Sequence, residues 1–116
     1  MRFGKYVRDR REKLREGSPS FSLRQVADRV GIEPAYLSKI ERDESAPPGE
    51  EMIRSIAREL NEDGDVLLAM AGKVSSDLQE VIRRRPALFG ELIRQLKGMP
   101  DHAVLRVVRE VRDGQW

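Results

Sequence analysis

The amino-acid sequence predicts an all-α fold, and two observations carry that prediction. Apolar residues recur at helical spacing along most of the 116 residues, which is the pattern of amphipathic helices. The breaks between these apolar stripes fall at Gly, Pro and Ser residues, which punctuate helices. Charged residues make up 36% of the chain and hydrophobic residues 39%, which suits a soluble protein built from such helices.

Residues 21–42 predict two short helices joined by a tight turn, and the chain is organised around them. Ser22 and Gln25 have the spacing of a capping box at the start of the first helix. Gly31 suits the left-handed residue at which a helix commonly ends. Pro34 suits the first position of the second helix, where its missing N–H costs nothing.

Helical periodicity separates the inner from the outer positions of this pair. The inner positions form one apolar stripe, made of Val26, Ala27, Val30, Leu37 and Ile40. The outer positions of the second helix are Tyr36, Ser38 and Lys39.

Helices on both sides of the pair are predicted to complete a five-helix domain. The first spans about residues 3–15, and the breaker cluster at residues 17–20 is interpreted as part of a mobile loop. An amphipathic helix spans residues 50–60. Asp63 is expected to cap a last short helix over residues 66–71.

This arrangement resembles the helix-turn-helix of lambda repressor and Cro proteins, the XRE family of bacterial and phage regulators. Ala27 matches the small residue between the two helices, and Gly31 matches the turn glycine. Leu37 and Ile40 match the buried positions of the second helix. The resemblance covers residues 1–72 and implies a lambda-repressor-like DNA-binding domain of Cro/C1 type.

The resemblance also implies a structural ion pair. In this family an Arg on the first helix commonly pairs with a Glu near the end of the second motif helix, and by position these are Arg11 and Glu41. If the pair is buried, removing one partner costs about 3–5 kcal/mol because the other charge is left uncompensated. We favour this role for Glu41 over a catalytic one.

A helix-turn-helix places its second helix in the major groove of DNA, where base edges present a distinct pattern for each base pair. The candidate base contacts are therefore the outer residues Pro34, Ala35, Tyr36, Ser38 and Lys39. The candidate phosphate contacts are Ser22, Arg24, Arg29 and Arg42. Tyr36 has the alternative of packing against the loop, and Lys39 that of a solvated side chain. The acidic residues Asp43 and Glu44 would repel DNA if they faced it.

Beyond the predicted domain, residues 73–116 predict a helical extension of three helices. They begin at Ser75 or Ser76, at Pro86, and after Pro100. Their apolar stripes are too large to leave bare on a monomer, and about 40 residues are too few for a separate core. We expect the last two helices to supply a homodimer interface, with an intramolecular extension or another protein as alternatives. Trp116 either anchors that interface or is disordered.

Composition excludes several function classes. The 22 Lys and Arg nearly balance the 20 Asp and Glu, so the net charge of +2 argues for no particular partner. With no Cys and only His102, the sequence suggests no metal site, no cofactor and no catalytic arrangement. No membrane-spanning run or secretory signal is evident, so the expected location is cytoplasmic.

The sequence therefore predicts a sequence-specific double-stranded DNA-binding transcriptional regulator and no enzyme. By analogy with the family it would be a dimeric repressor on a two-fold symmetric operator. The alternative is an antitoxin-type or partner-controlled regulator whose C-terminal helices bind another protein.

Overall fold

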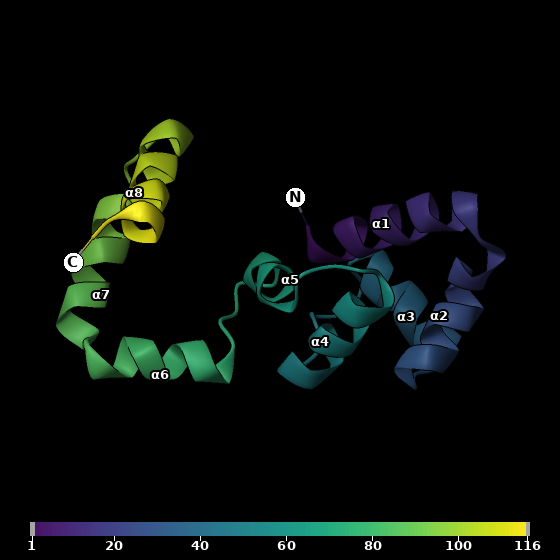
Figure 1. The fold of residues 1–116 in the computed structure, drawn as a ribbon. Coiled ribbons are helices and arrows are strands. Elements are labelled where there is room, and N and C mark those ends of the chain that lie inside the picture. The colour runs from purple at the N-terminus through teal and green to yellow at the C-terminus, as the bar shows by residue number, and fades with distance from the viewer. Residues whose placement is uncertain (1, 116) are drawn as a thin grey trace. The chain divides into compact units, whose positions relative to one another are not determined.

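The computed structural model describes residues 2–115, and all the regular structure in these residues is helical (Figure 1). The all-α prediction is confirmed. In chain order the elements are α1 (Phe3–Gly17), the 3-10 helix η1 (Pro19–Phe21), α2 (Leu23–Val30), α3 (Pro34–Glu41), α4 (Glu50–Glu59), α5 (Gly64–Met70), α6 (Ser76–Arg84), α7 (Pro86–Leu96) and α8 (Asp101–Asp113). Trp116, whose role the sequence leaves open, lies outside the described residues.

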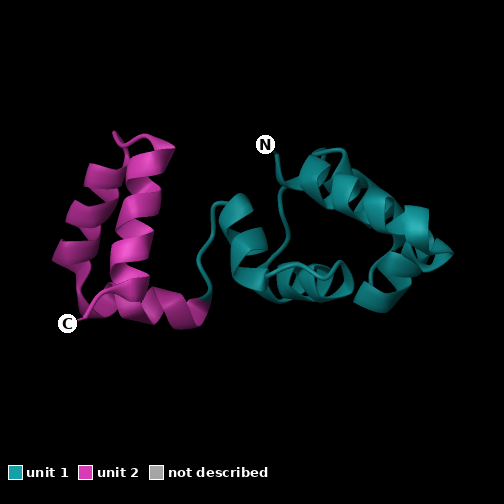
Figure 2. Ribbon diagram, turned by 45° about the horizontal axis from the view of Figure 1, so that its top comes forward, with its two compact units in different colours: residues 1–75 teal, residues 76–116 magenta. Residues whose placement is uncertain are grey.

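The chain forms two compact units, residues 1–75 and residues 76–116 (Figure 2). We call them the N-terminal unit and the C-terminal unit. The N-terminal unit holds α1 to α5, and the C-terminal unit holds α6 to α8. The boundary between them falls a few residues after residue 72, where the sequence places the end of the DNA-binding domain.

One hydrophobic core lies inside the N-terminal unit, and each of its five α-helices contributes to it. The buried apolar side chains are Phe3, Val7, Val26, Ala27, Leu37, Ile40, Ile53, Ile56, Ala57, Leu60, Leu67 and Leu68. Burying a side chain the size of Val, Leu or Ile contributes about 1.5–3 kcal/mol. The five helices therefore stabilise one another as a single domain.

Local sequence signals set the ends of the motif helices. Gly31 has a φ of 88°, and its N–H donates to the Ala27 carbonyl at 2.9 Å, which closes α2 in a left-handed turn. Pro34 occupies the first turn of α3. Asp63 caps α5 by accepting from the Asp65 N–H at 2.8 Å.

Only half of the predicted capping box is formed at the start of α2. The Ser22 Oγ accepts from the Gln25 N–H at 3.3 Å, as the sequence predicts. The Ser22 N–H donates to the Pro19 carbonyl at 3.2 Å. The preceding turn therefore occupies the donor that a capping box leaves for the Gln25 side chain.

The segment interpreted as a loop before α2 has regular structure, which corrects the sequence prediction. α1 continues to Gly17, and Pro19–Phe21 form η1. The Ser18 Oγ accepts from the Ser20 N–H at 3.3 Å and so caps η1. A 3-10 turn that begins with Pro after a Ser cap has the same composition as an irregular loop, which is why the sequence did not distinguish them.

The C-terminal unit differs from the N-terminal unit because none of its described residues is buried. α6 begins at Ser76 and α7 begins with Pro86 in its first turn, as predicted. α8 follows Pro100 and extends to Asp113. The three helices form without a core of their own.

Candidate nucleic-acid interface

The two motif helices pack through their inner stripe. Val26 and Ala27 of α2 are buried, as are Leu37 and Ile40 of α3. Ala27 has no exposed surface, so a larger side chain there would push the helices apart. The position of α3 on the surface is thus fixed from beneath by the core.

The opposite side of α3 is open to solvent. Ala35 and Lys39 are exposed, and Pro34 and Ser38 are half-buried beside them. Residues four apart on a helix are neighbours, so these residues form one strip, which we call the outer strip. Within the described residues, the Lys39 side chain makes no hydrogen bond or ion pair, so its ammonium group is available to a ligand.

Tyr36 departs from the outward orientation that the sequence predicts. It is half-buried and packs against the core cluster. On a helix it falls next to the buried Ile40, at the border between the inner and outer faces. The ring of Tyr36 therefore supports α3 from its edge.

A buried ion pair joins α1 to α3 at the residues that the resemblance pairs. The Arg11 Nε donates to the Glu41 Oε2 at 2.8 Å, and a second Arg11 nitrogen donates to Oε1 at 2.9 Å. Each side chain is 4% exposed. These hydrogen bonds raise the pKa of Arg11 above its ordinary value, so the guanidinium stays charged although it is buried.

Arg11 also fixes the entry to α2. Its third nitrogen donates to the Phe21 carbonyl at 3.1 Å, directly before the Ser22 cap. The same guanidinium therefore contacts both η1 and the end of α3. The start of α2 and the outer strip of α3 are held in one geometry by one side chain.

A second link between α1 and α3 uses Asp43, which sequence reasoning treated as a loop acid that would repel DNA. The Gly4 N–H in the first turn of α1 donates to the Asp43 Oδ1 at 2.9 Å. Asp43 reaches this position with a φ of 57°, in the left-handed region. Its carboxylate caps α1. A Cβ atom at Gly4 would overlap the Ile40 carbonyl oxygen, so the close contact requires glycine.

The four residues predicted to contact phosphates differ in their exposure and in the partners of their side chains. Arg24 is exposed and, within the described residues, its side chain forms no hydrogen bond or ion pair. The Ser22 Oγ caps α2 as an acceptor, and its own proton remains available. Arg42 pairs with Glu44 at 3.1 Å, and both side chains are about half exposed. Such exposed pairs contribute little to stability and exchange readily.

Arg29 has a structural position instead. Its Nε donates to the Glu59 Oε2 at 2.7 Å, and another of its nitrogens donates to the Ser20 carbonyl at 2.7 Å. The guanidinium also lies 5.4 Å from the centre of the Phe21 ring, within the range of a cation–π contact. Arg29 therefore joins α2 to η1 and α4.

The sequence places Arg8 in a basic cluster around the first helix, which is either a solvated helix face or a contact with DNA phosphates, and the structure brings Arg8 to the motif. A hollow of about 260 Å³ lies between α1, the start of α2 and α3, and it is lined by Arg8, Arg11, Glu12, Leu23, Ser38, Glu41 and Arg42. Arg11 pairs with both acids of this hollow, the buried Glu41 and the half-exposed Glu12, and the exposed cations Arg8 and Arg42 stand beside Ser38 of the outer strip. Arg8 lies one turn before Arg11, and the packing of α1 on the motif separates it from the other basic residues of that cluster.

Comparison with known proteins identifies this arrangement. Residues 12–67 match the family model described as Helix-turn-helix. The matched stretch contains α2, the Gly31 turn and α3 entirely, together with most of the core described above. Residues 12–67 belong to the helix-turn-helix family. The resemblance to lambda repressor and Cro proteins is confirmed, and this helix-turn-helix domain is that of a DNA-binding transcriptional regulator.

Neither the curated proteins nor the solved structures contain a match to the chain. No helix within residues 2–115 is long and apolar enough to cross a membrane. No cluster of His, Cys, Asp and Glu in the same residues has an arrangement that could hold a metal ion.

Proposed function

We propose that this regulator is a dimeric repressor that reads the major groove of double-stranded DNA with α3. One observation carries the proposal, namely the division of α3 into two faces. Leu37 and Ile40 anchor one face in the core, while Ala35 and Lys39 are exposed on the other. The major groove is wide enough for an α-helix, so a helix held in this way enters it without any change in the domain.

The residues of the outer strip have suitable chemistry for base edges. The Lys39 ammonium group is a donor for the O6 and N7 acceptors of guanine. The Ser38 hydroxyl donates or accepts, and the Ala35 methyl group packs on a thymine methyl. Pro34 lies in the first turn, the part of a recognition helix nearest the bases. Tyr36, at the border of the strip, is assigned to the sugar–phosphate side of the groove.

Phosphate contacts are assigned to the exposed polar groups around the strip. Arg24 and Ser22 lie at the first turn of α2, whose free N–H groups favour an anion. Arg42 and Arg8 lie beside Ser38, around the hollow between α1, the start of α2 and α3. Arg29 is not included because a phosphate would have to displace Glu59. Each neutralised phosphate is expected to add about 0.9 to the slope of log affinity against log salt.

A dimer is proposed because one α3 spans only a short stretch of one groove. Two copies related by a two-fold axis read an inverted repeat whose half-site centres lie about 34 Å apart, or a multiple of that distance. Repression is assigned by analogy with lambda repressor and Cro proteins. The alternative, control by another protein at the C-terminal helices, is motivated by the exposed apolar side chains of α7 and α8.

The test is a selection of bound duplexes from a randomised DNA pool by the full chain, at two salt concentrations. We expect an inverted repeat to be enriched and the affinity to fall at the higher salt concentration. Binding without sequence preference at both concentrations would contradict the proposal.

A further inference from the structure

The helices of the C-terminal unit expose the kind of side chains that form the core of the N-terminal unit. On α7 and α8 the large apolar residues that are 41% to 68% exposed are Leu88, Leu92, Ile93, Leu105, Val108 and Val111. A unit of this size with no buried residue is too small to be stable in isolation. Its apolar surface requires a partner.

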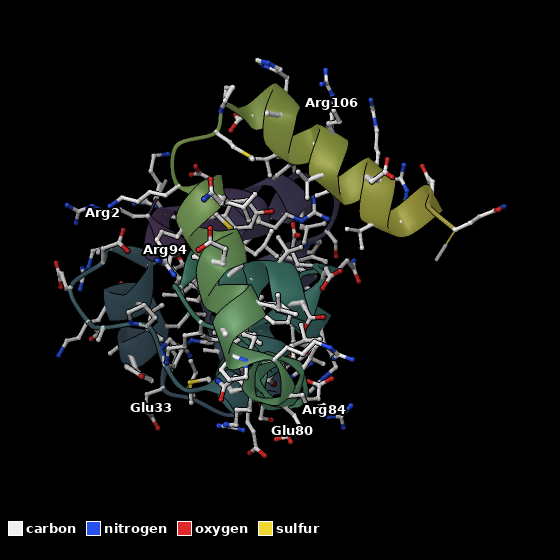
Figure 3. All side chains as sticks on the ribbon, turned by 90° about the vertical axis from the view of Figure 1, so that its left-hand side faces the viewer. Arg2, Glu33, Glu80, Arg84, Arg94 and Arg106 are labelled. Carbon is white, nitrogen blue, oxygen red and sulfur yellow. The ribbon has the colours of Figure 1, made fainter. Side chains whose placement is uncertain are left out.

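Part of this surface is a groove of about 460 Å³ along α7 and α8. Its lining is almost entirely aliphatic and consists of Leu92, Leu96, Val104, Val107, Val108 and Val111, with Arg112 at one end. On α8 the four valines fall at positions 104, 107, 108 and 111, a spacing that places them in one stripe. Arg106 points away from α8 into solvent (Figure 3). Its place in the helical repeat puts it on the opposite side of α8 from the stripe.

The N-terminal unit does not offer a matching surface. Among its described residues only Val66 and Val74 are large apolar side chains with high exposure, at 49% and 41%. A second copy of the C-terminal unit offers an identical apolar stripe. Of the six exposed residues, Leu92, Val108 and Val111 line the groove, and they are the ones that a second copy of the stripe would cover.

The charges beside the stripe are complementary to those of a second, antiparallel copy. Asp101 and Arg112 lie about three turns apart on α8, so they flank the stripe on the same side. Val107 lies midway between them. A two-fold axis near Val107 brings Asp101 of each copy next to Arg112 of the other. Arg112 pairs with Asp113 of its own helix at 2.9 Å, but that pair is exposed and can be exchanged.

We propose that the valine stripe of α8 packs antiparallel against α8 of a second copy of this chain, with its two ends closed by Asp101–Arg112 pairs. The inference deepens the proposed function, because it names the surface through which the proposed dimer forms. It commits to a two-fold, self-complementary interface.

The first test measures the oligomeric state of the full chain by sedimentation equilibrium. We expect a dimer, and we expect Val108→Lys to weaken it by at least about a hundredfold because a charge is placed where no partner can solvate it. Val66→Lys is the matched control, since Val66 at 49% and Val108 at 50% have nearly equal exposure. A monomeric wild-type chain, or equal weakening by both substitutions, would overturn the interface.

The second test uses charge reversals at the ends of the stripe, so its result is independent of whether the Val108→Lys variant folds. Asp101→Arg and Arg112→Asp each place like charges together across the two-fold axis and are expected to weaken the dimer. The double variant Asp101→Arg/Arg112→Asp restores opposite charges and is expected to recover most of the wild-type affinity. A double variant weaker than either single variant would contradict the antiparallel arrangement.

DNA binding distinguishes failure of this interface from failure of the proposed function. If the chain is monomeric but still selects one DNA sequence, the proposed interface is wrong and the proposed regulator function stands. A dimer abolished by Val108→Lys, together with binding that has no sequence preference, would support the interface and contradict the regulator.

Discussion

The buried Arg11 side chain sets the geometry of the candidate DNA-binding surface, although it is not itself exposed on that surface. Its guanidinium bonds to the Glu41 carboxylate and to the Phe21 carbonyl, so it joins α1, η1 and α3. A buried ion pair is often no better for stability than an apolar pair of the same size. Its consequence here is geometric, because it sets where the start of α2 lies relative to the outer strip.

Breaking this pair is expected to be costly. Glu41→Gln leaves the buried Arg11 charge with only the half-exposed Glu12 carboxylate, 3.2 Å away, as its partner, and should lower the free energy of unfolding by about 3–5 kcal/mol. The control is Glu44→Gln, which removes an exposed partner of Arg42. This substitution should change the free energy of unfolding by less than about 1 kcal/mol. Urea denaturation of the full chain measures both. Equal effects of the two substitutions would show that the buried pair is not the link we describe.

Gly4 provides a second test of the contact between α1 and α3. Gly4→Ala places a methyl group against the Ile40 carbonyl oxygen, and we expect a loss of about 1–3 kcal/mol in the free energy of unfolding. Gly17→Ala is the control, because a Cβ atom there meets no other atom within 4 Å. Thermal unfolding should show a lower Tm for Gly4→Ala only. An unchanged Tm for that variant would contradict the close approach.

At the scale of the elements, local signals and long-range contacts differ in how well the sequence predicts them. Ser22, Gly31, Pro34 and Asp63 mark helix ends through chemistry that acts within a few residues, and each acts as predicted. A periodic pattern identifies the buried face of a helix but not the residue that lies opposite. The sequence therefore predicted the helices better than it predicted their side-chain partners.

Three residues illustrate this limit. Asp43 caps α1, 39 positions away at Gly4, and Arg29 binds Glu59, 30 positions away. Neither partner is visible in the local sequence. Arg8 is one of several arginines on α1, and only the packing of α1 on the motif identifies it as the one beside Ser38.

The two arginines of α2 have different surroundings, so we predict an effect on DNA binding for Arg24 and an effect on stability for Arg29. Arg24→Ala should weaken binding to all DNA sequences alike and lower the salt slope by about 0.9 per subunit, with little change in stability. Arg29→Ala should lower the unfolding midpoint, because it removes the contacts with Glu59, Ser20 and Phe21. Fluorescence anisotropy at several salt concentrations and urea denaturation separate the two effects. If Arg29→Ala lowered the salt slope at unchanged stability, its assignment as a structural residue would be wrong.

At the scale of the whole molecule, the two units are both helical but differ in what they bury and what they expose. The N-terminal unit has a complete core and presents the outer strip of α3, while none of the described residues of the C-terminal unit is buried and its helices present apolar faces. The sequence predicted this contrast through the unmatched stripes of the last helices. A monomer sequence does not reveal the partner that covers them, because the same stripe suits a second copy or another protein.

On the proposed function, the outer strip of α3 specifies the DNA sequence, while the surrounding cations only bind the phosphates of the DNA. The deciding measurement repeats the selection from a randomised duplex pool with Lys39→Ala and Arg24→Ala beside the wild-type chain. We expect Lys39→Ala to lose the preference at one position of each half-site and Arg24→Ala to enrich the same repeat as wild type at lower affinity. If the repeat enriched by Lys39→Ala were identical to that of the wild-type chain, α3 would not read DNA in the way proposed here.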